Sequence, residues 1–544
     1  MPAWMLIITF LIPAILAKPT LDPSIHRQLL LNGRPQIGLW KALLREQEAV
    51  EYLSAYSNTQ NTFKNKRPSI FEPHCFPQKV SHFDPSNNET FCQRYWVDAS
   101  LYKPGGPIFL LDGGETSGEN RLPFLEKGIL EILSNHTEGL SIILEHRYYG
   151  ESVPVKSFST DDLRFLNNAE ALEDSAHFIE NFELPQSLSI DYSLHPNETP
   201  WFYYGGSYAG ARAAHMRVQY PHLVWGAIAS SAVVHAQINF PQYFDPIQQY
   251  GPSDCINTLQ RAIEFIDNML DRPGPWPKIF KGFFGLDALE DEDFADVISS
   301  PLNYWQAKNW DLTVGSNEFY NFCDTLTAGG ASNKIGIIRV PASVANYAKY
   351  VRERIVTQCP GRSNADIQEC FSTQDDSSFR KTDLNQTWRL WIFQVCTQWG
   401  YFMPAPKGGP RIVSKRLTLD YTAKICKQAF PPGNYFSVPH QPDVDEVNRR
   451  GDYDIKIDRL AFIDGDRDPW RPMTPQSDTA ERRESTIQRP VHIIFDGVHH
   501  YDENGLKNHL EEPARIRDVH DFEKLFVSEW LSQWKERNVS GKVV

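Results

Sequence analysis

A chain of 544 residues is too long for one ordinary hydrophobic core, so two domains, or one domain with a large insertion, are expected. Aromatic residues make up 12% of the sequence, no low-complexity tract interrupts it, and the composition is that of a globular protein. The formal net charge of −14 argues against nucleic acid as a partner.

Residues 1–17 have the pattern of a secretory signal peptide. The apolar stretch from Trp4 to Leu16 is too short to span a bilayer, and Ala17 is a small residue suited to cleavage. No other stretch reaches the roughly 18 apolar residues that a transmembrane helix needs. We therefore expect no membrane span and a secreted, extracellular protein, with a vacuolar or lysosome-like compartment as the alternative destination.

The cysteines and the glycosylation motifs agree with secretion. An even number of cysteines and the absence of any C-x-x-C pair favour disulfides over a zinc ribbon or a thioredoxin-like site, although the sequence leaves the pairing open. The cysteines are Cys75, Cys92, Cys255, Cys323, Cys359, Cys370, Cys396 and Cys426. N-glycosylation is predicted at the N-x-S/T sequons that begin at Asn88, Asn135, Asn197, Asn385 and Asn538.

Residues 18–80 are polar, contain two short helical patterns, and are interpreted as an N-terminal arm or pro-segment. From Ser81 onward, SHFDPSNNETFCQRYWVD alternates like two strands joined by a turn at 85–88. The first part of an α/β core is therefore expected at 81–232.

Strand-like and helix-like segments alternate through this first part. Apolar runs typical of buried strands lie at 106–114, 140–150, 201–204 and 224–232. Between them, residues 163–179 carry apolar side chains every three or four positions, as an amphipathic helix does. This alternation predicts a doubly wound, mostly parallel α/β sheet with helices on both faces.

The segment WFYYGGSYAGARAAHM at 201–216 has the layout of a nucleophile elbow, in which a sharp turn carries a serine between a strand and a helix. The first helical N–H groups could receive a developing oxyanion. Gly205 fits the first position of the usual G-x-S-x-G pattern around Ser207, but the last position is Ala209, with Gly210 one residue later. Taken alone, the segment is equally compatible with an ordinary turn.

The alternation stops after this first part. Residues 233–450 are mostly helical in pattern, are rich in aromatic residues and hold six of the eight cysteines. Strand-like segments resume at 456–470 and 489–503, and an amphipathic helix follows near the end. One α/β domain with a helical cap insertion at 233–450, completed by 451–544, accounts for this better than two sequential domains.

A serine nucleophile needs a base, and the base needs an acid that holds its tautomer. In doubly wound hydrolases the chain order is serine, acid, histidine, each at the end of a strand. The strand before Trp470 offers Asp464, Asp466 and Asp468, and the following strand offers His499 and His500. Each candidate has an ordinary structural alternative, such as a helix cap or a loop residue, but together they occur in the required order.

Several further motifs carry a family resemblance. They are GGSYAG at 205–210, EHRYYGES at 145–152, FLNNAEALED at 165–174, DGDRDPW at 464–470, GVHH at 497–500, FCD at 322–324 and CTQWGYF at 396–402. With these motifs the chain resembles the serine peptidases of family S28, which includes Pro-X carboxypeptidase, dipeptidyl peptidase 2 and fungal acid prolyl endopeptidases. The fungal secreted members look most similar.

The resemblance implies an α/β-hydrolase fold with a disulfide-bearing cap, and Ser207 as nucleophile, Asp468 as orienting acid and His499 as base. Asp468 is preferred because it immediately precedes Pro-Trp, and His499 because it follows Gly-x. The chain departs from the usual family pattern at Ala209 and at Asp464, where Asn is frequent. These departures remove no catalytic group but leave substrate preference open.

The oxyanion hole is expected from the backbone N–H of Tyr208 and a second N–H, assigned to Gly114, in the loop after the first strand. The family's preference for proline suggests an apolar pocket lined by Trp470, with Trp399 and Phe402 from the cap. Glu115 is a candidate for binding the free amino group of a substrate, with a structural partnership to Arg147 or another cation as the equal alternative.

Two other function classes are compatible with the triad and the fold. A secreted carboxylesterase or lipase would use the same residues, and a non-catalytic binding protein would retain the fold. No H-E-x-x-H motif and no phosphate loop occurs, so no metal and no cofactor are expected. Peptide or protein substrates, proline-rich among them, are the expected partners; the sequence leaves open the oligomeric state and the choice between endo-, carboxy- and dipeptidyl cleavage.

Overall fold

The computed structural model describes residues 71–185, 188, 192–359 and 361–540. The predicted signal peptide at 1–17 and most of the predicted N-terminal arm lie outside these residues. Within the described ranges, no helix combines the length and apolar character needed to cross a membrane.

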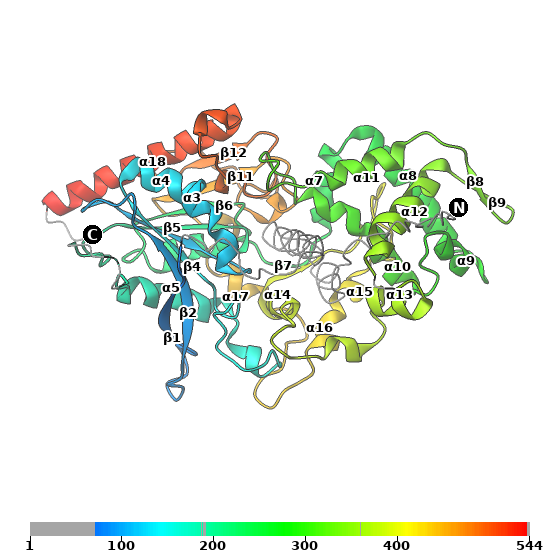
Figure 1. The fold of residues 1–544 in the computed structure, drawn as a ribbon, viewed down its shortest axis with the longest axis horizontal. Helices are drawn as coiled ribbons and strands as arrows, with labels where there is room; N and C mark the ends of the chain where they lie inside the picture. The colour runs from blue at the N-terminus through cyan, green and yellow to red at the C-terminus, as the bar shows by residue number, and fades with distance from the viewer. Residues whose placement is uncertain (1–70, 186–187, 189–191, 360, 541–544) are drawn as a thin grey trace, which may run out of the picture.

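A large sheet of eight strands forms one half of the molecule, in the order β1-β2-β4-β3-β5-β6-β11-β12 (Figure 1). β1 and β2 pair antiparallel, β2 and β4 pair antiparallel, and all other pairs are parallel. The strands are β1 His74–Lys79, β2 Thr90–Asp98, β3 Ile108–Asp112, β4 Leu140–Leu144, β5 Trp201–Gly206, β6 Gly226–Ser230, β11 Leu460–Gly465 and β12 Val491–Ile494. This confirms the predicted doubly wound, mostly parallel sheet of an α/β hydrolase.

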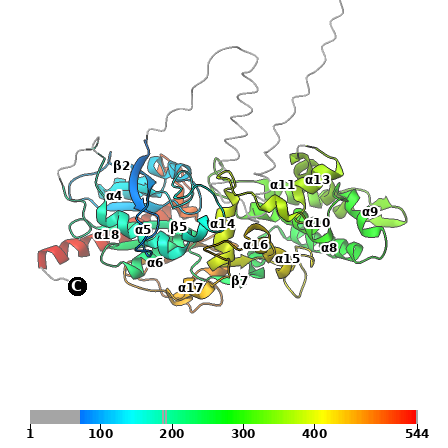
Figure 2. The same cartoon turned by 90° about the horizontal axis from the view of Figure 1, so that it is seen from below.

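Helices cover both faces of the sheet (Figures 1 and 2). Side chains of the central strand β5 contact helices on each of these faces. Phe202 stacks at 6.3 Å on Trp530 of α18, whereas the hydroxyl of Tyr203 lies 2.9 Å from that of Ser175 on α5. Successive side chains of a strand point to opposite faces, so both faces of β5 are buried. The helices of the core are α3 Pro123–Glu126, α4 Ile129–Thr137, α5 Asn168–Asn181, α6 Tyr208–Gln219 and α18 Ala514–Ser540.

The first strand begins earlier than predicted. β1 lies within the segment interpreted as an N-terminal arm, and its register pairs Cys75 with Arg94 and Pro77 with Cys92. Its side chains are alternately buried and exposed, and Pro77 is tolerated because β1 is an edge strand. The core therefore begins before residue 81, the predicted boundary.

The chain between β6 and β11 folds mainly as helices and forms the other half of the molecule (Figures 1 and 2). We call residues 233–450 the cap. Two small sheets pair β7 Gln237–Asn239 with β10 Gly400–Phe402, and β8 Asn333–Ile335 with β9 Ile338–Val340. The helices of the cap are α7 Phe244–Tyr250, α8 Ser253–Leu270, α9 Trp276–Phe283, α10 Asp291–Ser299, α11 Glu318–Thr327, α12 Ala342–Tyr350, α13 Asn364–Phe371, α14 Trp388–Gln394, α15 Leu419–Ala423, α16 Ile425–Ala429 and α17 Val444–Asn448.

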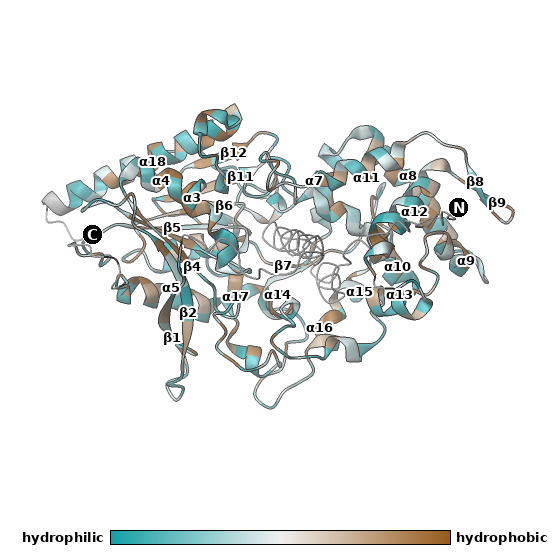
Figure 3. Cartoon of the chain, viewed as in Figure 1, coloured by the Kyte–Doolittle hydropathy of each residue, from teal (hydrophilic) through white to brown (hydrophobic). Residues whose placement is uncertain are grey.

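All eight cysteines are paired in disulfides, as the even count predicted. Cys75–Cys92 joins β1 to β2, and the other three bridges lie in the cap: Cys255–Cys323, Cys359–Cys370 and Cys396–Cys426. Hydrophilic residues predominate along α18 (Figure 3). The residues of β3, β4, β5 and β6, by contrast, are buried throughout.

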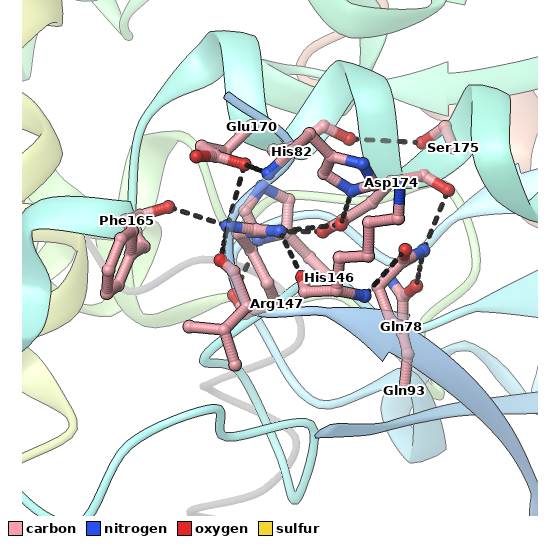
Figure 4. Close-up of polar contacts among 12 residues, drawn as sticks. Gln78, His82, Gln93, His146, Arg147, Phe165, Glu170, Asp174 and Ser175 are labelled. Carbon is pink, nitrogen blue, oxygen red and sulfur yellow. Dashed lines mark hydrogen bonds and ion pairs between the residues drawn. The ribbon is translucent and has the colours of Figure 1, made fainter. Parts of the chain in front are cut away.

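A buried ion network explains two of the sequence motifs (Figure 4). Arg147 of EHRYYGES forms two 2.6 Å bonds to the Asp174 carboxylate of FLNNAEALED and lies 3.6 Å from Glu170. The remaining guanidinium N–H groups donate to backbone carbonyls, including that of Phe165 at 3.0 Å, and His82 contacts Asp174 at 2.8 Å. These contacts join the segment that follows β4 to α5, and the Arg147 side chain that makes them is fully buried.

Arg147→Ala should lower the free energy of unfolding by about 3–5 kcal/mol, because it leaves the Asp174 and Glu170 carboxylates buried without their cation. Urea unfolding followed by tryptophan fluorescence measures the change. Arg380→Ala is the matched control, since its ion pair with Asp376 at 3.4 Å is exposed and should contribute at most about 1 kcal/mol. Equal effects of the two substitutions would contradict the assigned role of the network.

Candidate active site

Ser207 occupies a strained turn between β5 and α6. Its φ of 61° lies in the region that favours glycine, and its N–H donates to the Ser230 carbonyl at 2.9 Å. A Cβ atom at Gly205 would lie 2.1 Å from the Ala209 carbonyl oxygen, and one at Gly210 would lie 2.6 Å from that of Ser230. Glycine is therefore required at both positions, and the small Ala209 is accommodated between them.

Asp468 and His499 form a buried hydrogen-bonded pair. Asp468 follows β11, His499 follows β12, and Asp468 Oδ2 lies 2.8 Å from His499 Nδ1. The second carboxylate oxygen accepts the N–H of Trp470 at 2.9 Å. Burial alone would raise the pKa of Asp468, but His499 and the hydrogen bonds that the carboxylate accepts hold this pKa below its ordinary value.

The other candidates for acid and base have different neighbours. Asp466 lies 4.0 Å from Arg467, and Asp464 is buried in β11 without contact to a histidine in the described part of the chain. His500 lies 2.8 Å from Glu503, and burial lowers its pKa. Of these groups, the structure thus brings together the two that the sequence selected.

Ser231 is a supporting residue that sequence analysis missed. It follows β6 with a φ of 44°, and its hydroxyl accepts the N–H of His500 at 2.9 Å and hydrogen-bonds the Asp468 carboxyl. Ser231 therefore connects the loop after β11, which carries Asp468 and which we call the acid loop, to the loop after β12, which carries His499 and which we call the histidine loop. Its position at the carboxyl end of a predicted strand, at the same sheet edge as Ser207, was the signal that could have identified it.

The predicted oxyanion donors come from α6 and from the loop after β3. Tyr208 opens α6, where the first N–H groups of a helix have no partner within the helix. The N–H of Gly114, however, donates to Asp112 at 3.0 Å, and that of Gly113 donates to Leu144 at 2.8 Å. Gly114 is therefore engaged within its own loop, and the next N–H, that of Glu115, is bonded to the Glu115 carboxylate.

The Tyr208 side chain is fixed by a neutral histidine. Burial and the neighbouring Arg212 guanidinium lower the pKa of His146 to about 3. His146 Nδ1 lies 2.7 Å from the Arg147 carbonyl, so this nitrogen carries the proton, and Nε2 accepts the Tyr208 hydroxyl at 2.9 Å. The ring of Tyr208 is held edge-on by Trp399 at 5.0 Å.

A cleft of about 140 Å³ opens between the core and the cap at Ser207. Glu115, Phe402 and Trp470 line it, as the sequence predicted for substrate contacts, but Trp399 does not: this residue is fully buried and packs behind Tyr208. The cap also supplies polar lining residues that no sequence pattern indicated, including Asp296, Asn303, Thr373, Lys424 and Gln428.

Trp470 lies in an aromatic cluster beside His499, the candidate for the catalytic base. Its ring lies 5.4 Å from Phe240, 5.0 Å from Tyr401 and 6.4 Å from His499. Its indole N–H donates to Gln306 at 2.8 Å. The cluster gives the cleft a rigid apolar wall.

Glu115 does not pair with Arg147, whose carboxylate partners are Asp174 and Glu170. A structural partnership with Arg147 is therefore contradicted, whereas Arg121 is a cation that acts on Glu115. Burial raises the pKa of Glu115, against the opposing effects of its own N–H and of Arg121.

The sequon side chains at Asn88, Asn135, Asn197 and Asn385 are all exposed. The side chain of Asn538 lies outside the described residues.

Comparison with known sequences decides the family. A family model described as serine carboxypeptidase S28 matches residues 78–518. The chain belongs to peptidase family S28. The match contains every motif on which the resemblance was based, and the family is one of serine peptidases.

Relatives of this S28 chain include fungal proteins. A probable extracellular serine carboxypeptidase of Arthroderma benhamiae is 38% identical over 484 residues, which cover 84% of this chain and 66% of that protein, just under two thirds of its length. The serine protease vicPa of Bipolaris victoriae is 27% identical over 480 residues, 84% of this chain and 88% of that protein. Among solved structures, the alignment with a proline iminopeptidase of Mycobacterium smegmatis covers 81% of this chain and 96% of that protein, with 13% identity and a TM-score of 0.36.

The histidine loop rests on a buried carboxyl group. Asp502 accepts the hydroxyls of Tyr204 at 2.6 Å and Ser230 at 2.5 Å, and its backbone carbonyl contacts His520 of α18 at 3.0 Å. Burial raises the pKa of Asp502 to about 6, against the effect of the two hydroxyls. Burial and the adjacent Asp502 likewise raise the pKa of Glu523 on α18.

These shifts predict a pH dependence of stability. As pH rises from the ordinary Asp pKa of 3.8 to about 6, Asp502 loses its proton in the unfolded state before it does so in the folded state, so ionisation favours unfolding. The free energy of unfolding should therefore fall across this window, and less steeply in Asp502→Asn. Urea midpoints at pH 4 and 6.5 measure the difference, with Asp518→Asn, an exposed carboxyl of α18, as control. An unchanged slope in Asp502→Asn would contradict the assignment.

Proposed function

We propose that this S28 protein is a secreted serine peptidase that cleaves peptides on the carboxyl side of proline through Ser207, His499 and Asp468. The observation that carries the proposal is the buried 2.8 Å contact between Asp468 and His499 at the sheet edge where the strained turn presents Ser207 to the cleft. The contact supplies the acid–base pair that acyl transfer requires, and its position supports Ser207 as the nucleophile.

The contact fixes the tautomer of the base. With Nδ1 bonded to the Asp468 carboxylate, the neutral His499 ring carries its proton there, and Nε2 is left to accept the hydroxyl proton of Ser207. Ser207 Oγ then attacks the scissile carbonyl, and His499 passes the proton to the leaving amine. A water molecule, deprotonated by the same base, hydrolyses the acyl-enzyme and regenerates Ser207.

The oxyanion of each tetrahedral intermediate would be bound by the N–H groups of Tyr208 and Glu115. Glu115 replaces Gly114 in this role because the Gly114 N–H already donates to Asp112. Substrate binding would have to displace the Glu115 carboxylate from its own N–H. Loss of one such donor typically costs about 10²–10³ in rate.

A proline side chain would lie against the aromatic wall formed by Trp470 and Phe402. Proline is short, apolar and rigid, so a flat, preformed aromatic surface binds it with little loss of conformational entropy. Gln306 holds the Trp470 ring through its indole N–H, which keeps the wall in place. Peptide or protein substrates rich in proline are the expected partners.

Glu115 lines the cleft next to Ser207 and is the group that we assign to the amino terminus of a substrate. Lys424 lines the cleft from the cap and offers the opposite charge to a carboxyl terminus. Only one of these contacts is needed by an exopeptidase, and an endopeptidase needs neither.

Secretion is supported by the signal-like residues 1–17, the disulfides, the exposed sequons and the description of the Arthroderma relative as extracellular. A vacuolar or lysosome-like compartment is the alternative destination.

Cleavage of one proline-containing peptide, offered with free and with blocked termini, tests the substrate class. Mass spectrometry should locate cleavage after proline in the wild type and none in Ser207→Ala. Loss of cleavage on blocking the amino terminus, with a similar loss in Glu115→Gln, would identify an aminopeptidase-type enzyme; survival of cleavage with both ends blocked would identify an endopeptidase. Hydrolysis of acyl esters without cleavage of any peptide would refute the proposal.

Asp468→Asn should lower kcat about 10⁴-fold, because an amide stabilises the wrong tautomer of His499. Asp466→Asn is the matched control: it lies two residues away in the same loop and should retain near wild-type turnover. Comparable losses in both variants, measured on the same peptide, would mean that the acid has been assigned to the wrong residue.

A further inference from the structure

One segment of the cap contacts both catalytic loops. Residues 305–311, with the sequence WQAKNWD, begin at the last residue of a short 3-10 helix, Ser300–Trp305, and precede α11. We call them the clamp segment. No sequence motif singled them out, and apart from the contact of Gln306 with Trp470 the proposed function does not use them.

The clamp segment holds the acid loop on both sides of Asp468. The indole N–H of Trp305 donates to the Arg467 carbonyl at 2.9 Å, immediately before the acid. Two residues after the acid, the Trp470 indole donates to Gln306 at 2.8 Å. Movement of this part of the cap would therefore break contacts on both sides of Asp468.

The same segment holds the histidine loop. The indole N–H of Trp310 donates at 2.8 Å to the carbonyl of Tyr501, two residues after His499. Asp311, the next residue, lies 3.4 Å from Lys127 of the core, close to the start of α4. Thus the clamp segment spans from the acid loop to the histidine loop.

The clamp segment is itself rigid. Trp305 is fully buried, packs edge-on against Phe319 of α11 at 5.0 Å, and carries the Lys308 ammonium over its ring at 3.8 Å. A Cβ atom at Gly315 would lie 2.8 Å from the Asn309 backbone nitrogen, so the returning chain packs directly against the segment. A rigid element can fix the loops that it touches.

We propose that the clamp segment sets the relative position of Asp468 and His499, with Trp305 and Trp310 as positioning residues that act through backbone carbonyls. The inference rests on the proposed function of the triad. Neither tryptophan lines the cleft, so their contribution is to turnover and not to substrate binding. Docking of the cap on the core would then be a condition for an assembled triad.

The experiment measures the second-order rate constant with which a small fluorophosphonate modifies the full-length protein. This reagent needs an activated Ser207 but no particular peptide, and the rate constant refers to each active molecule, so partial unfolding does not change it. Trp305→Phe and Trp310→Phe, which lose only the indole N–H and part of the ring, should each lower it about tenfold, because small displacements of catalytic groups cost that much or more. With a peptide substrate, kcat should fall while KM stays unchanged.

Trp225→Phe is the matched control, because it removes an indole N–H that donates at 2.8 Å to a backbone carbonyl, that of Trp530, at the opposite end of the strands. Its rate constant should equal that of the wild type.

Lys127→Met removes the contact between Lys127 and Asp311, so it weakens the attachment of the clamp segment to the core without changing either tryptophan. It should lower the rate constant about twofold to fivefold. It keeps the test valid where a tryptophan variant fails to fold.

Unchanged rate constants in the clamp variants, or equal losses in Trp225→Phe, would overturn the inference. An unreactive wild type would instead refute the proposed function, so the two failures are distinguishable.

Discussion

The strained backbone at Ser207 is the constraint on which the rest of the site depends. A positive φ at a residue with a side chain costs about 1–3 kcal/mol and persists only where the surroundings over-determine it. Here β5 enters the turn from the centre of the sheet, and α6 leaves it anchored by Arg212, which donates to Asp112 of β3 at 2.6 Å. Gly205 and Gly210 leave no room for a side chain on either side of the turn.

Two supports converge on this turn from opposite sides. On the side of Tyr208, the buried charges of Arg147 and Asp174 fix the end of β4, and the neutral His146 fixes the Tyr208 hydroxyl. On the side of Asp468 and His499, Ser231 and the clamp segment join loops that follow different strands. Family motifs that contain none of the proposed catalytic groups thereby acquire a physical role, which is to limit the freedom of those groups.

The sequence predicted most of the core and the sheet edge at which the candidate site residues lie, because both depend on local patterns. Long apolar runs and the serine turn are readable along the chain, and the ends of parallel strands meet at one sheet edge. β1 was misplaced because a short edge strand with Pro77 has a weak pattern. The packing of Trp399 behind Tyr208 could not be predicted because it depends on residues distant in the sequence, and the donation from Gly114 to Asp112 could not because it depends on the conformation of the loop. The cap residues that face the cleft come from many segments and share no motif.

The most direct test of the central claim is to locate the nucleophile chemically. A fluorophosphonate should add once to the wild-type protein, and peptide mapping by mass spectrometry should place the adduct on Ser207. His499→Ala should retain the fold and Ser207 but lose nearly all of this reactivity, because Ser207 would then lack its base. A label on another residue, or equal labelling of His499→Ala, would contradict the triad assigned here.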